Sequence, residues 1–145
     1  MLFKRNGLIK KIKLEQGSAL VEFAVIAPIL LVLIAGIIQF GFILNAKIAV
    51  NAASFEGARA AILSENPEED ALMAVYYYAN SSLPGWSFDE RLAADIAIDG
   101  YNPGDNVLVK VNYEVPVFFQ SLLPMGNSNF FKVESKSLMR IEEKR

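Results

Sequence analysis

An uncharged apolar run of 22 residues, from Phe23 to Leu44, constrains this chain more than any other feature. At about 1.5 Å per residue, a helix over this run is roughly 33 Å long, which is enough to cross a hydrocarbon core of about 30 Å. A cleavable secretory signal has a shorter apolar region followed by small residues at the cleavage site, and no such site follows Leu44. The run therefore predicts a membrane-spanning helix, with a buried core helix of a soluble protein as the alternative.

The charges on either side of this run differ in sign. Residues 1–17 carry five basic side chains and one acidic one, whereas the rest of the chain carries 9 basic and 15 acidic side chains. Basic residues beside a membrane span favour the cytoplasmic side. We therefore expect a single-pass protein of the cytoplasmic membrane, with a basic cytoplasmic leader at 1–17, a transmembrane helix at 18–44 and an exported domain at 45–145.

The composition excludes most kinds of catalytic site. The chain has no Cys and no His, so it cannot form a Ser-His-Asp triad, a Cys-His pair or a zinc site built on imidazole or thiolate. The net charge of −2 disfavours nucleic acid as a partner, and no glycine-rich phosphate loop is present. We expect no enzyme activity, no cofactor and no metal. A tethered carboxylate-dependent hydrolase stays open as a minor alternative, with its candidate acids at Asp89, Glu90, Asp95 and Asp99.

Two residues near the start of the apolar run are unusual for a membrane helix. Glu22 lies inside apolar sequence that begins at Ala19, where an unpaired carboxylate is costly, so it either has a partner or extends to the headgroup level. Pro28 lies within the predicted helix and removes one backbone hydrogen bond, which predicts a kink or loosened turn near Ala24.

Four short motifs occur in order along this part of the chain. They are the run from Gly17 to Phe23 (GSALVEF), Pro28 within the apolar run, Gln39-Phe40-Gly41 at its exit, and Glu56-Gly57-Ala58-Arg59 beyond it. Together they resemble the TadE-like family of pilin-related proteins from tight-adherence pilus systems. The resemblance covers roughly residues 16–61, and the rest of the chain matches only in general character.

This resemblance implies processing and assembly. A prepilin peptidase would cut on the cytoplasmic side after Gly17, which leaves Ser18 as the new N-terminus. Glu22 and Phe23 would then serve recognition and assembly, with the carboxylate of Glu22 pairing with the N-terminal amine of a neighbouring subunit. The implied partners are the peptidase, other pilin and pseudopilin subunits, the inner-membrane assembly platform and membrane lipid. An uncleaved, membrane-anchored surface domain that binds a ligand or a secretion partner is the alternative.

Beyond the membrane, the helical pattern continues to about residue 63, with many small residues that allow close packing. Glu56 and Arg59 lie three residues apart and are expected to form a modest surface pair. Asn66 and Pro67 begin a second helix that runs to about Ser81. Its expected buried face consists of Leu72, Val75, Tyr76, Ala79 and Leu83.

From Ala94 the apolar period changes to two. Alternating residues predict a strand that includes Ile96 and Ile98, a Pro-Gly turn at 102–105, a strand at 107–115 and a third at about 130–141. The expected fold is α+β and pilin-like, with a long helix packed on a small antiparallel sheet. An apolar loop at 117–125 covers the end of the sheet, enters the outer leaflet or contacts a neighbouring subunit.

Overall fold

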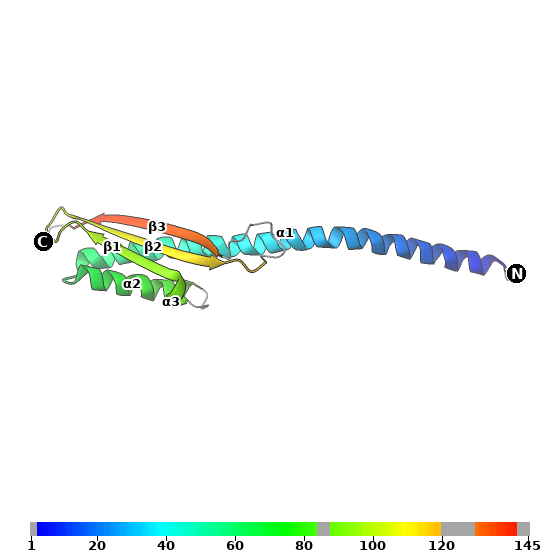
Figure 1. Ribbon diagram of the computed structural model, residues 1–145, viewed down its shortest axis with the longest axis horizontal. Helices are drawn as coiled ribbons and strands as arrows, with labels where there is room; N and C mark the ends of the chain where they lie inside the picture. The colour runs from blue at the N-terminus through cyan, green and yellow to red at the C-terminus, as the bar shows by residue number, and fades with distance from the viewer. Residues whose placement is uncertain (1–2, 84–87, 120–129, 142–145) are drawn as a thin grey trace.

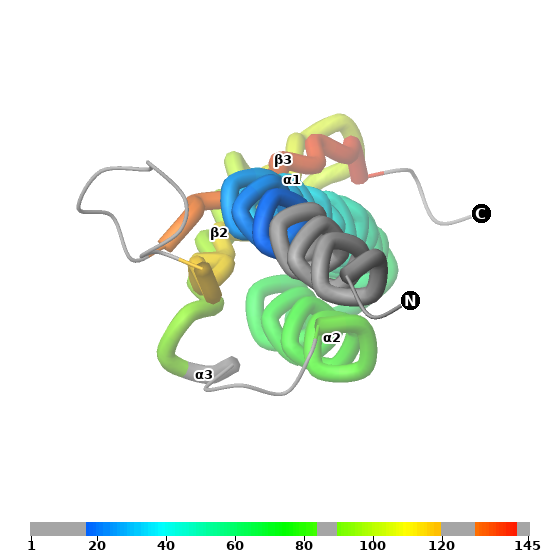
Figure 2. The backbone as a smooth tube through the Cα atoms, turned by 90° about the vertical axis from the view of Figure 1, so that its right-hand side faces the viewer, coloured from blue at the N-terminus to red at the C-terminus, as the bar shows by residue number. Residues whose placement is uncertain are grey.

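The computed structural model combines one very long helix with a small sheet and a second helix (Figure 1). It describes the backbone of residues 3–83, 88–119 and 130–141, and the side chains of residues 17–83, 90–119 and 130–141. Helices α1 and α2 lie side by side against the sheet, and the N-terminal part of α1 extends far beyond both (Figures 1 and 2). The predicted α+β class, with a long helix on a three-stranded antiparallel sheet, is confirmed.

Helix α1 runs without interruption from Phe3 to Leu63, over 61 residues. Its predicted end near residue 63 is confirmed, but it begins well before the apolar run from which we predicted it. Residues 3–22 contain no proline, and their two glycines cost a helix only about 1 kcal/mol each, so nothing in the sequence stops the helix earlier. The helix also continues through Pro28.

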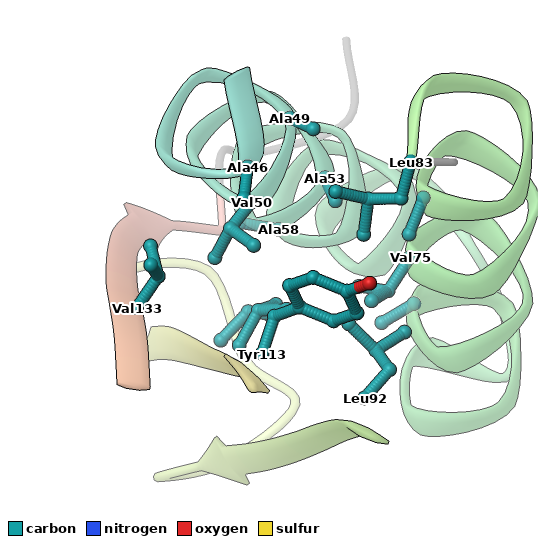
Figure 3. Close-up of a cluster of buried hydrophobic side chains, with 14 of the residues drawn as sticks. Ala46, Ala49, Val50, Ala53, Ala58, Val75, Leu83, Leu92, Tyr113 and Val133 are labelled. Atoms are coloured by element: carbon teal, nitrogen blue, oxygen red, sulfur yellow. The ribbon is translucent and has the colours of Figure 1, made fainter. Parts of the chain in front are cut away.

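The C-terminal half of α1 packs on the rest of the chain through small side chains. The buried positions are Ala46, Ala49, Val50, Ala53, Ser54, Gly57, Ala58 and Ala61. They recur at steps of three and four residues, so they share one face of the helix. Because these side chains are short, both α2 and the sheet approach the axis of α1 closely (Figure 3).

Helix α2 runs from Pro67 to Ser82, close to the predicted bounds. The side chain of Asn66 makes no capping hydrogen bond, contrary to our expectation. Instead, Ser64 Oγ bonds to a carboxylate oxygen of Asp70 and accepts a hydrogen bond from the Asn66 backbone N–H at 2.8 Å. The tight turn from α1 leaves Asn66 with a ψ of 72°, outside the extended conformation that a capping side chain usually needs.

The predicted buried face of α2 is confirmed at Val75, Ala79 and Leu83, whereas Tyr76 is half-buried and the prediction is wrong at Leu72. Pro67, Ala71, Val75 and Ala79 are buried, as is Leu83 just beyond the helix, whereas Leu72 is 42% exposed. We expected Leu72 in the core because it is large and apolar. The close approach of α2 to α1 selects alanine for the contact line instead, and Leu72 lies beside that line.

The sheet consists of β1 (Leu92–Ile98), β2 (Asn106–Pro116) and β3 (Phe130–Arg140), in the order β1-β2-β3 and antiparallel throughout. A one-turn helix, α3 (Phe88–Arg91), precedes β1 and was not predicted. Every second residue of β2 from Val107 to Val115 is buried, as predicted, and Tyr113 lies in the middle of the core (Figure 3). The central strand therefore supplies the apolar face that α1 and α2 cover.

The predicted turn between β1 and β2 is confirmed. Gly104 has a φ of +101°, a conformation that side chains with a Cβ rarely adopt. The N–H of Asp105 bonds to Asn102 O at 3.0 Å, and the N–H of Gly104 bonds to Ile141 O at 2.9 Å. The turn therefore also fixes the end of β3.

Gly57 lies where α1 and α2 approach each other closely. A Cβ at this position would lie 2.5 Å from Val75 Cγ2 and 3.3 Å from Ala71 O. We expect Gly57→Val to destabilise the fold by about 2–3 kcal/mol, since the buried Val75 has one preferred rotamer in a helix and cannot move aside. Thermal unfolding of the detergent-solubilised chain, followed by near-ultraviolet circular dichroism, should show a midpoint lowered by about 8 °C or more.

Gly41→Val is the matched control. Gly41 lies on the same helix, and a Cβ at this position would meet nothing within 4 Å. Equal midpoints for the two variants would contradict the packing described above.

Candidate functional site

The N-terminal half of α1 exposes an unusual amount of apolar surface. Only 6% of its most apolar 18-residue window is buried within the chain, so it is not the core helix of a soluble domain. The helix is long and apolar enough to cross a membrane. The large exposed side chains between residues 20 and 40 include Leu20, Val21, Phe23, Val25, Ile26, Ile29, Leu30, Leu31, Leu33, Ile34, Ile37 and Phe40. This surface needs lipid or other apolar helices around it.

The residues of the predicted processing and assembly site lie at the start of this surface. Gly17, Ser18, Glu22 and Phe23 are all exposed on α1. A Cβ at Gly17 would meet nothing within 4 Å, so no packing among the described residues requires a glycine there. Ser18 and Glu22 are one helical turn apart and lie on the same face. Among the described residues, no basic group forms an ion pair with Glu22.

Pro28 is exposed within the continuous helix. The predicted loosened turn near Ala24 stays a prediction, since the helix bounds alone do not test it.

Gln39 joins the apolar helix to the sheet, a role that the sequence did not predict. Its side chain is 2% exposed, although its neighbours Ile38 and Phe40 are exposed. Its Nε2 donates to Pro116 O at 3.0 Å, and its Oε1 accepts a hydrogen bond from the Phe118 N–H at 3.0 Å. The amide thus satisfies one backbone group at the last ladder position of β2, Pro116, and one just beyond it, Phe118. The available signal was a lone polar side chain in an apolar run, which is costly without a partner.

The contact at Gln39 continues along α1 in both directions. Ala35, one turn before, is 3% exposed, and the rings of Phe42 and Phe118 lie 4.9 Å apart. Val117, Phe118 and Phe119 are half-buried, so this first part of the predicted apolar loop lies against the chain. Residues 120–125 of that loop lie outside the described residues.

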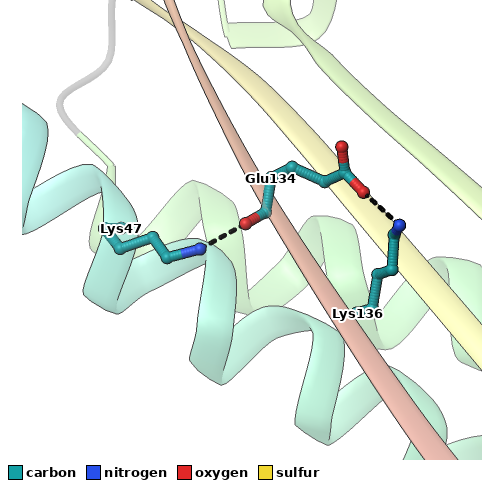
Figure 4. Close-up of polar contacts among 3 residues, drawn as sticks. All are labelled: Lys47, Glu134 and Lys136. Carbon is teal, nitrogen blue, oxygen red and sulfur yellow. Dashed lines mark hydrogen bonds and ion pairs between the residues drawn. The ribbon is translucent and has the colours of Figure 1, made fainter.

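Two polar contacts fix β3 on α1 further along. Lys47 Nζ donates to the backbone carbonyl of Glu134, whose carboxylate forms an ion pair with Lys136 at 2.8 Å (Figure 4). The hydrogen bond and positive charge of Lys136 lower the pKa of the exposed Glu134 carboxyl. One layer deeper, Ser54 Oγ and Ser135 Oγ are 2.9 Å apart in the buried interface. The contacts of Lys47 and Ser54 each join α1 to β3.

Two residues of the Glu56-Gly57-Ala58-Arg59 motif lie at the surface and two lie in the core. Glu56 and Arg59 form the predicted surface pair, with a separation of 4.0 Å. An exposed pair of this kind contributes at most about 1 kcal/mol. Gly57 and Ala58 face inward and are buried, and Gly57 lies against Val75 and Val109. The motif therefore supports packing of this helix within its own chain.

An open hollow lined by residues of all three strands does not resemble a hydrolase site. It has a volume of about 470 Å³, and Glu90, Glu114 and Glu134 are among the residues that line it. Glu114 pairs with Lys132 at 3.6 Å, and Glu134 pairs with Lys136 at 2.8 Å, so a lysine balances the charge of each of these two carboxylates. Burial raises the pKa of the Tyr113 phenol, an effect partly offset by the nearby Arg91. No group of three potential metal-ligating side chains occurs among the described residues.

Comparison with known families supports the resemblance that the sequence predicted. Residues 17–59 match the family model described as TadE-like protein. The match begins at Gly17 and ends at Arg59, so both ends coincide with motifs singled out above. No curated protein matches the chain, and no solved structure matches it. The TadE-like match together with the apolar helix fits a pilus-related membrane protein.

The matched segment lies entirely within α1. It includes Gln39, Lys47 and Ser54, three polar side chains of the helix that bond to the sheet end or to β3. The sheet and α2 lie outside the residues that match the family model. The family resemblance therefore covers the helix and the groups with which it holds the sheet.

We expect Gln39→Leu to release the chain after β2 from α1, because Pro116 O and the Phe118 N–H both lose their partner. Hydrogen–deuterium exchange of the full-length chain in detergent should show faster uptake at Phe118, while the centre of β2 around Val111 exchanges as before. Phe40→Leu, which places the same new residue at an exposed neighbouring position, should leave both unchanged. Unchanged exchange at Phe118 in Gln39→Leu would show that the amide does not hold this segment.

Proposed function

We propose that this chain is a minor subunit or assembly factor of a tight-adherence pilus, made as a precursor and cut after Gly17 by a prepilin peptidase. The observation that carries the proposal is the TadE-like match, which starts at Gly17 and continues through an apolar helix that the chain itself leaves uncovered. Families of this type act through structure and assembly, so we assign the protein no catalytic role.

The proposed topology follows the charges. The basic leader at 1–17 lies in the cytoplasm, residues 18–44 cross the membrane, and residues 45–145 lie outside. Cleavage on the cytoplasmic side removes the leader and leaves an amine on Ser18. The mature protein then presents the apolar half of α1 to lipid, and on assembly to the equivalent helices of other pilin and pseudopilin subunits at the inner-membrane platform.

Glu22 gives this assembly its register. Its carboxylate is exposed one turn from Ser18 and has no ion-pair partner among the described residues. In an apolar environment a carboxylate strongly favours a position beside a positive charge, and the new amine of a neighbouring subunit supplies one. Removing one member of such a pair leaves the other uncompensated, so the pair restricts how subunits can be aligned.

Processing is tested by the N-terminal residue of the chain recovered from cells that contain their own prepilin peptidase. The wild type should begin at Ser18. Gly17→Leu should remain uncut, because a bulky side chain hinders the peptidase at an extended backbone. Gly41→Leu is the control within the same helix and should be cut normally. An intact basic leader in the wild-type protein would refute processing and favour an uncleaved, anchored surface domain.

The role of Glu22 is tested after processing. Glu22→Gln should be cut like the wild type but should recover at least roughly tenfold less of the other pilin subunits on co-purification, which corresponds to about 1.4 kcal/mol. Glu22→Asp keeps the charge and should restore part of the loss. Glu56→Gln, which removes a half-buried carboxylate elsewhere on α1, serves as the control. Wild-type recovery with Glu22→Gln would exclude the charge pair.

A further inference from the structure

The depth of Gln39 in the membrane follows from the length of the span. If the hydrocarbon core of about 30 Å begins at Phe23, it ends about 20 residues later, near Phe42. Gln39 and Phe42 then lie at the outer boundary of the hydrocarbon or just inside it. This step rests on the proposed function, because it requires that α1 spans the membrane.

The end of the sheet reaches the same depth. Beyond β2 the chain runs on along α1 toward its N-terminal end (Figure 1). Gln39 holds Pro116 and Phe118 through hydrogen bonds of 3.0 Å, and the Phe118 ring lies 4.9 Å from that of Phe42. Residues 116–119 therefore lie beside α1 at the level where the membrane ends.

The chemistry of this end suits lipid. Pro116, Val117, Phe118 and Phe119 carry no charge, and Phe130, which pairs with Pro116 across the sheet, is 39% exposed. The guanidinium carbon of Arg91 lies 5.0 Å from the centre of the Phe130 ring, so the cation at this end is placed where lipid headgroups begin. The opposite end of the same strand pair joins Asn106 to Arg140. The sheet thus has an aromatic end toward the apolar half of α1 and a polar end away from it.

The backbone of this segment is also adapted to a poorly hydrated environment. Unsatisfied N–H and C=O groups cost several kcal/mol each in hydrocarbon, so irregular backbone is tolerated there only when the protein satisfies it. Pro116 has no N–H, its carbonyl accepts from Gln39, and the N–H of Phe118 donates to Gln39. The side-chain amide supplies hydrogen bonds that water supplies elsewhere.

We propose that residues 116–119, together with Phe130, form a membrane-contact surface that sits in the outer leaflet beside α1. The partner of this surface is lipid at the boundary between headgroups and acyl chains. The contact fixes the height and tilt of the sheet above the membrane, because Gln39 connects the surface to the spanning helix.

The absence of cysteine from the chain allows a direct test with single-cysteine variants. Phe119→Cys and Val117→Cys report on the proposed surface, Ile34→Cys reports on the middle of the span, and Leu138→Cys reports on an exposed apolar position at the far end of β3. Each full-length variant is labelled with an environment-sensitive fluorophore. It is then placed in phosphatidylcholine and phosphatidylglycerol vesicles, with quencher either on the lipid acyl chains or in water on both sides.

The proposal expects labels at 117 and 119 to be quenched by lipid-borne nitroxide placed near the headgroups, and to lose most of their quenching by aqueous iodide. The label at 34 should respond only to a deep nitroxide, and the label at 138 only to iodide. Combining Phe119→Cys with Gln39→Leu should restore quenching by iodide, because the segment is no longer held at this depth.

Quenching of the labels at 117 and 119 by iodide, with the label at 34 still deep in lipid, would overturn the membrane contact and leave the span intact. Protection of both labels from iodide and from lipid nitroxide would also overturn it, in favour of a contact with a second protein chain. Quenching of the label at 34 by iodide would instead refute the span, and with it the proposed function.

Discussion

The structure depends on a mismatch in length between α1 and the sheet that covers it. An 11-residue strand extends about 36 Å, which matches roughly 24 residues of helix. Helix α1 has 61 residues, so the sheet can cover less than half of it. The contacts agree with this estimate, because they begin at Ala35 and Gln39 and end at Ala61. The remaining large apolar side chains have no partner among the described residues and need an apolar surrounding of another kind.

Side-chain size distinguishes the two halves of the helix, and this difference could be read from the sequence. The alanine-rich half predicted close packing, and the leucine- and isoleucine-rich half predicted a span. The strands were equally readable, because a period of two on β2 leaves only one way to bury Val107, Val109 and Val111. Composition, periodicity and turn residues therefore define the fold class and most of the element bounds.

The positions that could not be predicted depend on partners distant in sequence. Leu72 is exposed because α2 approaches α1 along a line of alanines, and helical periodicity does not reveal how closely two helices pack. Gln39 bonds to groups 77 and 79 residues away, so the sequence could show only that a buried amide needs partners. Asn66 does not cap α2 as expected, and the hydroxyl of Ser64 instead bonds to Asp70 and to the Asn66 N–H across the tight turn between the helices.

The polar contacts between α1 and the sheet need specific side chains on the helix but mostly backbone atoms on the sheet. Gln39 and Lys47 both bond to backbone atoms of the opposing segment, which any residue sequence provides. Of the three, Ser54 relies on a side chain, the hydroxyl of Ser135. The specific side chains therefore lie on the helix, and the sheet contributes mainly its backbone and its alternation of apolar residues. This arrangement explains in physical terms how a family match can end at Arg59 while the fold continues. A helix that bonds to backbone atoms can hold sheets of quite different sequence, provided that each has an apolar face.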